Sequence, residues 1–403
     1  MQIAVVGAGW AGLAAAVELI RRGSSVTLFE AGRVAGGRAR AVEIDGRRLD
    51  NGQHILLGAY HNTLALMRQV GADPDQLLIR HPLQISDSTG FKLTLPQWPA
   101  PWHVAWGLLR AHPVKAREKI KTARWMQGLK WRRFKVDPQL TVSAWLDAAG
   151  QTGQLRHHLW EPLCLAALNT PAEHASAQLF AHVLRDSLGS TRASDTDLLL
   201  PRDTLSELLP DPACRWLLAH GATLHFSHRV QHLSSDSSGV QIDGQAFDGA
   251  ILAVAPQHLA RLWPDTELPT AYEPIATVYL QFSAKTTLPY PLYNASGKVG
   301  QWVVDRGNGL LACVLSGHGD WEKLTDDQLA TTLQAEMGLT GPVHWQRCIR
   351  EKRATFSCRP QTPRPRWQTT SPAIRLAGDA SWHDYPATLE GAVRSGQRAA
   401  QSF

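Results

Sequence analysis

The first thirty residues pass from an apolar strand pattern to a helical pattern and back. Residues 2–6 are apolar and β-rich, residues 7–12 contain three glycines, and residues 13–23 follow a helical pattern that ends at a glycine. A second apolar run, residues 25–30, ends in an acid. This order of strand, glycine turn, helix, strand and acid predicts a βαβ unit of a parallel sheet.

The spacing of the glycines adds a chemical prediction to this pattern. Gly7, Gly9 and Gly12 form G-x-G-x-x-G, in which the first glycine permits a tight turn and the second lets backbone approach a pyrophosphate. The third lets helix pack on strand, and the helix N-terminus faces the phosphate charge. Glu30 follows at the distance at which an acid accepts hydrogen bonds from the ribose. The predicted dinucleotide site contains Gly7, Gly9, Trp10, Ala11, Gly12, Glu30 and Ala31.

Two later parts of the chain have patterns that fit the same domain. Residues 374–377 predict a strand that leads into Gly378 and Asp379, and Pro386 precedes a helical run. Residues 239–256 predict a short hairpin. We therefore expect an α/β fold, with a discontinuous Rossmann-like cofactor domain of residues 1–60, 200–265 and 365–403. A second, α+β domain would comprise residues 61–199 and 266–364 and cover the substrate.

One internal segment is strongly basic. The 403-residue chain has a net charge of +6, yet residues 110–135 hold ten Lys and Arg against one acid, Glu118. Trp, Leu and Phe are interleaved with these charges over residues 98–135. Such a segment is typical of an interfacial membrane anchor, with a solvated helix face or nucleic-acid binding as alternatives. No nucleic-acid module accompanies it, so we expect no nucleic-acid partner.

The rest of the sequence bears on the cellular location and on metal binding. No apolar run reaches the roughly 18 residues that a membrane span needs. The five cysteines are scattered without a C-x-x-C pair, so neither a disulfide framework nor a metal site is predicted. The N-terminus enters a strand directly, without the basic start of a signal peptide. These features predict a cytoplasmic protein without a bound metal.

Residues after the βαβ unit carry a resemblance to a known superfamily. Gly36-Gly37-Arg38 resembles the second glycine signature of flavoproteins of the amine oxidase and phytoene desaturase superfamily, and the late Gly-Asp and following helix resemble its C-terminal part. The resemblance implies FAD, with the late acid near the ribityl chain or pyrophosphate and the last helix N-terminus at the flavin N1/O2 edge. It adds these cofactor contacts: Gly37, Arg38, Gly52, Gln53, Val230, Gly378, Asp379, Ala387, Thr388 and Leu389.

Three stretches point to a narrower family. DNGQH at residues 50–54, WEPLCLAALNTP at 160–171 and GDASWHDYPATLEGAVRSG at 378–396 together resemble the hydroxysqualene dehydroxylase family, and the likeness covers essentially the whole chain. The resemblance implies hydride transfer from reduced flavin N5 to hydroxysqualene, giving squalene in squalene and hopanoid biosynthesis. It also places the apolar residues 160–168, a predicted buried helix ending near Asn169, as a substrate wall.

That reaction sets the chemistry that the site must supply. Loss of an allylic hydroxyl as water leaves a delocalised cation, so the site needs an acid and a dry apolar tunnel. His54 is the first candidate for the acid, with Asp50, Asp384 and Tyr385 as the others. The alternative for DNGQH is a hydrogen-bonded turn that only shapes the strand. His383-Asp384-Tyr385 is more polar than the family pattern, which leaves the identity of the acid open.

Other functions and partners follow from the same resemblance. A carotenoid or phytoene-type desaturase and a flavin amine oxidase are the alternatives, whereas Glu30, Arg38 and Gly378-Asp379 argue against a non-enzymatic prenyl-lipid carrier. We expect a hydrophobic isoprenoid substrate and peripheral contact with the inner face of the membrane through residues 98–135. Contact with other squalene-pathway enzymes is a further expectation.

Overall fold

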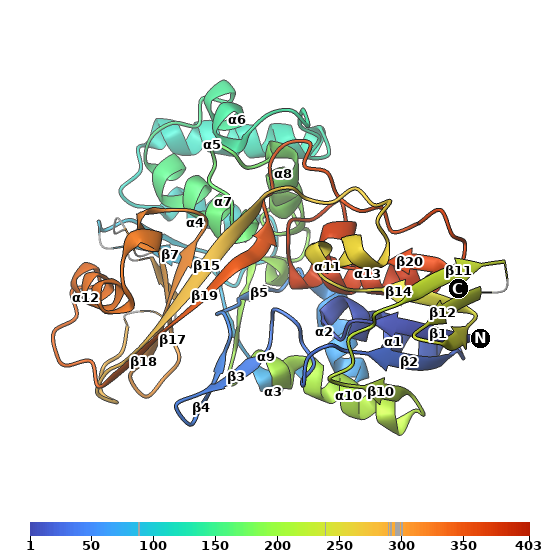
Figure 1. The fold of residues 1–403 in the computed structure, drawn as a ribbon. Coiled ribbons are helices and arrows are strands. Elements are labelled where there is room, and N and C mark those ends of the chain that lie inside the picture. Colours follow the sequence, from blue (N-terminus) through green and yellow to red (C-terminus); the bar gives the residue numbers. More distant parts are fainter. Residues whose placement is uncertain (88, 238, 289, 291, 295–298, 300) are drawn as a thin grey trace.

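The computed structural model describes residues 1–403 apart from 88, 238, 289, 291, 295–298 and 300. The predicted cofactor domain contains a five-stranded parallel sheet with the strand order β10-β2-β1-β14-β20 (Figure 1). Distant parts of the chain supply its strands: β1 (Gln2–Val6), β2 (Ser25–Phe29), β10 (Thr223–His225), β14 (Gly249–Leu252) and β20 (Ile374–Leu376). All five lie inside the three segments predicted for the cofactor domain, whose limits remain a prediction.

Both faces of the parallel sheet are covered, which is why its strands are continuous apolar runs. Ile3 and Val5 pack with α1 (Trp10–Arg21), which itself packs against α13 (Leu389–Gln401). Ala4 and Val6 pack on the opposite side with a small antiparallel sheet. The further covering elements are α2 (His61–Gln69), α10 (Pro210–Ala219), β11 (Leu233–Asp236), β12 (Gly239–Ile242) and β13 (Gln245–Phe247).

A second, antiparallel sheet lies beside the first, at the left of Figure 1. Its order is β16 (Leu292–Asn294), β17 (Trp302–Asp305), β18 (Leu310–Ser316), β15 (Tyr272–Gln281) and β19 (Trp345–Phe356). One face packs against α12 (Asp326–Glu336). The other face turns Tyr279, Val304 and Ala312 toward Leu49 and Leu200. The alternation of the two apolar sets follows from the two-residue period of a strand.

Short strands and turns connect the two sheets. Three small sheets are formed by β3 (Ala41–Ile44) with β4 (Arg47–Asp50), by β5 (Leu56–Leu57) and β6 (Leu78–His81) with β9 (Leu198–Pro201), and by β7 (Gln84–Ser86) with β8 (Lys92–Thr94). Short helices are α3 (Pro74–Leu77), α9 (Leu205–Leu208), α11 (Pro256–Leu262) and the 3₁₀ turns Ala193–Thr196, Asp320–Lys323 and Asp379–Ser381. The whole is the predicted α/β fold with a second α+β part.

A helical layer lies above the antiparallel sheet, at the upper left of Figure 1. It comprises α4 (Trp102–Arg110), α5 (Ala116–Trp131), α6 (Val142–Ala148), the π-helical turn Arg156–Trp160, α7 (Glu161–Leu168) and α8 (Ala177–Asp186). Trp145, Trp160 and Phe180 are among its buried side chains. Among the described residues, no helix combines the length and the apolar character needed to cross a bilayer.

The apolar helix of this layer differs from its prediction. We predicted a buried helix over residues 160–168, but only Cys164 and Leu168 of α7 are buried. Leu163 and Leu165 are half-buried, and Ala166 is exposed. The prediction of full burial was wrong because an apolar composition on all sides does not tell which side meets another element. One side of α7 packs into the helical core, and the other leaves apolar surface.

Candidate cofactor and substrate site

The glycine turn after β1 is too crowded for side chains at two positions and open at a third. A Cβ on Gly7, whose φ is +105°, would lie 2.6 Å from the Ala253 carbonyl oxygen, and one on Gly12 would lie 1.9 Å from the Gly7 carbonyl oxygen. Nothing lies within 4 Å of the corresponding point on Gly9. Gly9 is also the N-cap of α1 and makes no side-chain cap. The free N-terminal N–H groups of α1 therefore adjoin open space, as a bound pyrophosphate requires.

Glu30 closes the same turn from the end of β2. Its Oε2 accepts a hydrogen bond from the Ala8 N–H at 2.7 Å, and its Oε1 accepts one from the Gly32 N–H at 2.6 Å. Phe29 stacks on His225 with ring centroids 5.2 Å apart. Val230 is buried in the core beside Phe29. The structure thus brings the predicted ribose-binding acid Glu30 and the predicted cofactor contact Val230 to one end of the parallel sheet.

The second glycine signature contacts the first. The Gly36 N–H donates to the Ala8 carbonyl at 2.8 Å, and Gly37 lies against Gly9. Arg38 then forms an ion pair with Asp379, with 2.7 Å between Nη2 and Oδ1. These two residues are 341 positions apart in sequence, so folding joins the two motifs that carried the flavoprotein resemblance. Arg38 also donates from Nη1 to the Ala354 carbonyl of β19 at 2.6 Å.

Sequence reasoning missed the residue that holds the late Gly-Asp turn. Arg364 is 7% exposed and donates to the carbonyl groups of four residues in this turn: Asp379, Ala380, Trp382 and His383. A buried guanidinium with this many acceptors fixes the turn that presents Asp379. Arg364 lies in the proline-rich segment RPQTPRPRW, residues 359–367, which adjoins the predicted boundary between the two domains. The segment contains three arginines among its prolines, so the sequence pattern did not single out Arg364.

The last helix begins as predicted. Thr388 is the N-cap of α13 and accepts from the Gly391 N–H through Oγ1 at 3.1 Å. The adjacent Ala387 backbone hydrogen bonds to the buried Cys358 thiol, whose pKa burial raises to about 12. Ala387, Thr388 and Leu389 thus form a helix start that adjoins Cys358, two residues beyond the end of β19. Its N–H groups carry the partial positive charge expected at a flavin N1/O2 edge.

The DNGQH stretch begins at Asp50, the last residue of β4, and contacts β15 through Gln53. The Asp50 carboxylate accepts from the Leu205 N–H at 2.7 Å, its Oδ2 has no hydrogen bond among the described residues, and burial raises its pKa to about 6. The Gln53 N–H donates to Thr277 Oγ1 at 3.2 Å. His54 Nδ1 lies 2.7 Å from the Gly52 carbonyl. Burial, together with the nearby Arg38 charge, lowers the pKa of His54.

The four acid candidates fall into two groups. Asp50 and His54 lie on the DNGQH stretch, next to β15 and Arg38. Tyr385 is buried and donates through its hydroxyl to Asp186 of α8, and burial raises its pKa. Asp384 is exposed, and its carbonyl lies 2.8 Å from Nδ1 of His182, also on α8. The Tyr385 hydroxyl and the Asp384 carbonyl therefore bond to the helical layer. The Asp50 carboxylate bonds to α9 and its carbonyl to Tyr279 of β15, whereas His54 bonds to Gly52 of its own stretch.

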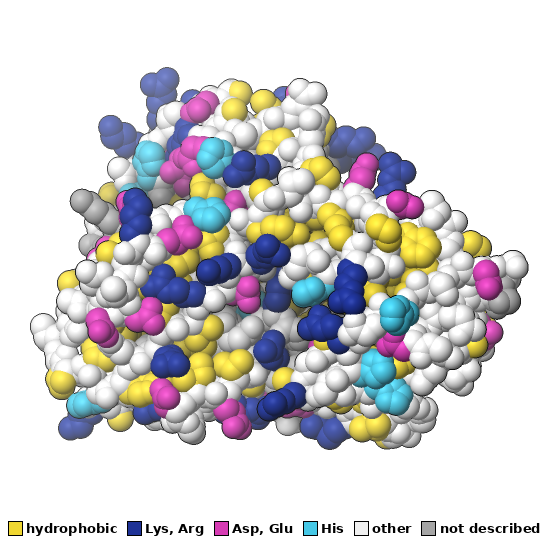
Figure 2. Space-filling view, viewed as in Figure 1, with side chains coloured by type: hydrophobic (Ala, Val, Ile, Leu, Met, Phe, Trp, Pro, Cys, Tyr) yellow, Lys and Arg dark blue, Asp and Glu magenta, His cyan; other side chains and the backbone are white. Residues whose placement is uncertain are grey.

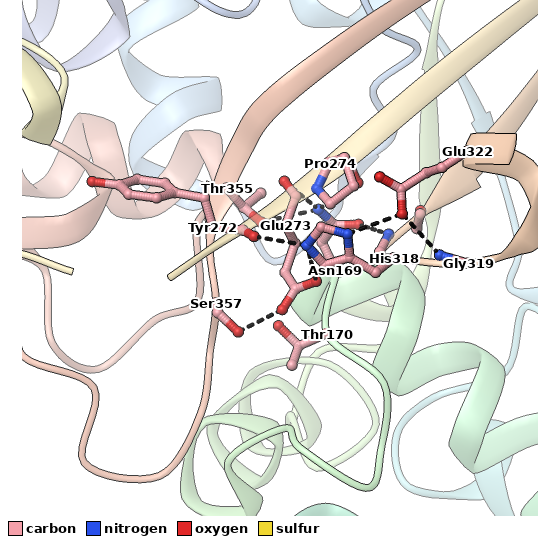
Figure 3. Close-up of polar contacts among 12 residues, drawn as sticks. Asn169, Thr170, Tyr272, Glu273, Pro274, His318, Gly319, Glu322, Thr355 and Ser357 are labelled. Atoms are coloured by element: carbon pink, nitrogen blue, oxygen red, sulfur yellow. Dashed lines mark hydrogen bonds and ion pairs between the residues drawn. The ribbon is translucent and has the colours of Figure 1, made fainter. Parts of the chain in front are cut away.

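Asn169, at the end of α7, ties the helical layer to the antiparallel sheet (Figure 3). It is a buried C-cap residue with a left-handed φ of +49°. Its Nδ2 donates to Thr355 Oγ1 at 3.0 Å, and its Oδ1 accepts from the Gly317 N–H at 2.8 Å. The same amide group lies 3.5 Å from the carbonyl oxygen of Glu273. The sequence predicted only that a helix ends here; the clamp depends on strands more than 100 positions away.

These features fit FAD. Gly9 leaves room at a helix N-terminus, Glu30 lies beside it at the position predicted to meet the ribose, and Arg38 and Asp379 meet where the two sheets adjoin. Lys and Arg side chains gather across the middle of the face in Figure 2. Together, the fold and this set of residues define an FAD-dependent oxidoreductase.

Comparison with known proteins agrees with this class. Residues 10–402 match the family model of flavin containing amine oxidoreductase. Hydroxysqualene dehydroxylase of Rhodopseudomonas palustris is 30% identical, over 98% of this chain and 96% of its own. The probable zeta-carotene desaturase of Synechococcus elongatus is 24% identical, over 100% and 98%. The chain therefore belongs to the flavin-containing amine oxidoreductases and, within them, to the hydroxysqualene dehydroxylase family.

A solved structure supports the fold. Wild-type putrescine oxidase bound to putrescine superposes with a TM-score of 0.70 at 18% identity, covering 100% of this chain and 98% of that one. This likeness concerns the fold alone. The predictions of FAD, of the superfamily and of the α/β fold are confirmed, whereas the individual site residues remain predictions.

Proposed function

We propose that this enzyme reduces hydroxysqualene to squalene, with water as the second product. The main support is the full-length similarity to hydroxysqualene dehydroxylase, together with apolar surface on α7 beside the cofactor elements. FAD in its reduced form supplies the hydride when bound. The protein must then bind the hydrocarbon, exclude water and place a proton at the departing hydroxyl.

The proposed hydrocarbon wall is the side of α7 that the fold leaves uncovered. Leu163 and Leu165 are half-buried and Ala166 is exposed. Asn169 fixes this helix to the strand that also contacts Arg38, so its position relative to the cofactor elements is set by hydrogen bonds. An apolar wall held in this way suits a long isoprenoid chain and keeps water from an allylic cation.

Asp50 and His54 are the two candidates that the structure favours for the acid. His54 lies nearer Arg38, but its lowered pKa keeps the imidazole neutral at pH 7, so it suits binding of the hydroxyl. Asp50 keeps its proton to a higher pH than an ordinary carboxyl, because burial raises its pKa to about 6. We propose that His54 orients the hydroxyl and that Asp50 is the protonated group. Asp384 and Tyr385 are weaker candidates, since the Asp384 carbonyl and the Tyr385 hydroxyl are both bonded to α8.

We also propose that the enzyme works on the surface of an anionic membrane. Trp98, Trp102, Trp106 and Leu109 are 46%, 66%, 39% and 59% exposed, and the last three follow the i, i+4, i+7 spacing of one face of α4. The neighbouring helix α5 carries the exposed cations Arg117, Lys121 and Arg124. Apolar side chains bordered by cations match the boundary between lipid tails and anionic headgroups. That location would also bring the enzyme near others that handle squalene.

Anaerobic single turnover tests the proposed reaction. The purified flavoprotein is photoreduced in detergent and mixed with hydroxysqualene, while flavin absorbance and products are followed. Reoxidation with one squalene formed per flavin supports the proposal. A fully loaded reduced enzyme that stays reduced contradicts it, and the oxidised enzyme is then assayed with polyenes for desaturation, the activity suggested by the similarity to zeta-carotene desaturases.

A further inference from the structure

A buried carboxyl group lies next to the cofactor elements but outside the residues considered so far. Glu273 of β15 is 2% exposed. Its Oε1 accepts from the Ser357 hydroxyl at 2.5 Å, and its Oε2 is 3.9 Å from Nε2 of His318 (Figure 3). Buried charges are retained only when other groups compensate them. Among the described residues, the ion-pair partner of Glu273 is the imidazole ring of His318.

Local backbone geometry directs Glu273 inward. The pairing of β15 with β19 shifts register between Glu273 and Ile275, which is a β-bulge. The Asn169 amide donates to the carbonyl groups that this bulge exposes, at 3.5 Å and 3.4 Å. Bulges redirect side chains and are frequent next to active sites. In Figure 3, Glu273 points toward Ser357, whereas the Tyr272 ring points away from it.

His318 joins this carboxyl group to solvent. Its side chain is 61% exposed. Nδ1 lies 2.9 Å from Glu322 Oε2, and Nε2 lies 3.3 Å from the Tyr272 carbonyl oxygen. Because each ring nitrogen faces an acceptor, the charged imidazolium is favoured, and the Glu322 hydrogen bond raises the pKa of His318. The ring thus holds a proton at the surface, next to the buried acid.

The inner end of the cluster adjoins the start of α13. Ser357, which donates to Glu273, is followed by Cys358, which is fully buried. The Cys358 thiol is hydrogen bonded to the Ala387 backbone, and the charges of Asp379 and Glu273 both act on it. Ala387 and Asp379 are two of the predicted flavin contacts. Glu273 therefore joins the exposed His318, through Ser357, to the chain segment whose next residue bonds to Ala387.

We propose that His318 and Glu273 form a proton-transfer pair connecting bulk water with the cofactor side of α13. A proton passes from Nε2 of His318 to Oε2 of Glu273, across a gap that rotation of the exposed ring closes, and water then reprotonates the ring. Release follows the same path in reverse, and only N–H and O–H bonds change. The other charged or titratable groups facing the pair are Glu322, Arg359, Arg353, Tyr272 and Cys358. The proposal requires flavin chemistry but not the proposed substrate.

Histidine titration by NMR tests whether the two groups interact. The His318 signal is assigned by its loss in His318→Ala and then followed against pH in the wild type and in Glu273→Gln. Removing the negative charge should lower the pKa of His318 by about half a unit or more. His344, exposed elsewhere on the same sheet, is the internal control and should not move. An unchanged His318 titration in Glu273→Gln would overturn the coupling.

Proton release on flavin oxidation tests the transfer itself. Reduced holoenzyme is mixed with ferricyanide and a pH-indicator dye, so that each anionic reduced flavin gives two electrons to two ferricyanide ions and one proton to water. Proton release should keep pace with oxidation in the wild type and in His344→Ala. It should lag severalfold in His318→Ala and recover with added imidazole, because the site is exposed.

The two failures can be told apart. If release keeps pace with oxidation in His318→Ala, the proton-transfer proposal is wrong, whatever the wild type does with hydroxysqualene. If the lag and its rescue occur but hydroxysqualene leaves the wild type reduced, the proposed substrate is wrong and the pair stands. His318→Ala carries this test alone if the buried substitution Glu273→Gln prevents folding.

Discussion

At the scale of the residue, the two carboxyl oxygens of Asp50 have different surroundings. Its Oδ1 accepts from the first N–H of α9, which is a structural contact, while its Oδ2 is buried without a hydrogen bond among the described residues. The raised pKa is the consequence, because burial penalises the charged form more than one hydrogen bond stabilises it. The same penalty appears in the pH dependence of stability.

For Asp50, the sign of this dependence is fixed by the direction of the shift. The folded pKa of about 6 exceeds the ordinary 3.8, so the folded state binds the proton more tightly and stability falls as pH rises between these values. The full loss is about 3 kcal/mol, of which about 1.4 kcal/mol falls between pH 5 and pH 8. Asn does not titrate, so the unfolding free energy of Asp50→Asn relative to the wild type should rise by about 1.4 kcal/mol between pH 5 and pH 8.

Urea unfolding at several pH values measures this difference. Asp265→Asn is the control, since Asp265 is exposed and its substitution should follow the wild type at each pH. A constant difference between Asp50→Asn and the wild type from pH 5 to pH 8 would show that Asp50 is not the buried acid described here.

Arg38 gives a second prediction at the scale of the residue. It joins the early glycine signature to Asp379 and Ala354, so Arg38→Ala removes a cation from the predicted phosphate or flavin side. We expect FAD affinity to fall at least about tenfold, as loss of a charged hydrogen bond predicts. The exposed neighbour Arg33 provides the control Arg33→Ala. Fluorescence titration of apoprotein with FAD compares them, and equal affinities for the wild type and Arg38→Ala would remove Arg38 from the site.

At the scale of the element, Asn169 holds α7 against β15 and β19. Asn169→Ala removes its side-chain hydrogen bonds and leaves, at a φ of +49°, an alanine, which tolerates the left-handed region less well than asparagine does. We expect unfolding free energy to fall by about 2–4 kcal/mol. Asn169→Gly removes the same bonds without the backbone strain and should lose about 1 kcal/mol less.

A matched turn separates the two contributions to the Asn169 effect. Asn308 also has a left-handed φ, of +53°, but it is exposed. Asn308→Ala should therefore show the backbone strain alone, of about 1 kcal/mol. If denaturant unfolding gives equal losses for Asn169→Ala and Asn308→Ala, the Asn169 clamp contributes nothing beyond backbone conformation.

At the scale of the whole molecule, the exposed face of α4 predicts where the protein meets lipid. Trp102→Ser with Trp106→Ser should lower binding to vesicles containing anionic lipid at least tenfold, because the rings supply the inserted apolar area. The melting temperature should stay nearly unchanged, since Trp102 is 66% exposed. Leu218→Ser is the control, as Leu218 is 58% exposed on α10.

Vesicle sedimentation across salt concentrations completes this test. Attraction between the basic face of α5 and anionic headgroups should weaken as salt rises. Replacing Arg117, Lys121 and Arg124 by Gln should reduce the salt dependence while leaving the tryptophan contribution. Vesicle binding that survives loss of both tryptophans would mean that α4 is not the lipid-facing element.

The sequence by itself determined those local structures that depend only on residues close together in the chain. The turn at Gly7, the acid at Glu30 and the start of α13 at Thr388 follow from local rules for glycine turns, strand ends and helix caps. The family resemblance, carried by the same short motifs, gave FAD and the fold. These predictions needed no knowledge of which distant segments meet.

Only the tertiary structure decided the contacts between distant segments. It paired Arg38 with Asp379, placed Arg364 beneath that turn and left one side of α7 uncovered. It also set Glu273 beside His318 by means of a bulge whose carbonyls Asn169 satisfies. None of these follows from spacing in sequence, because burial and charge pairing depend on which surfaces the folded chain brings together.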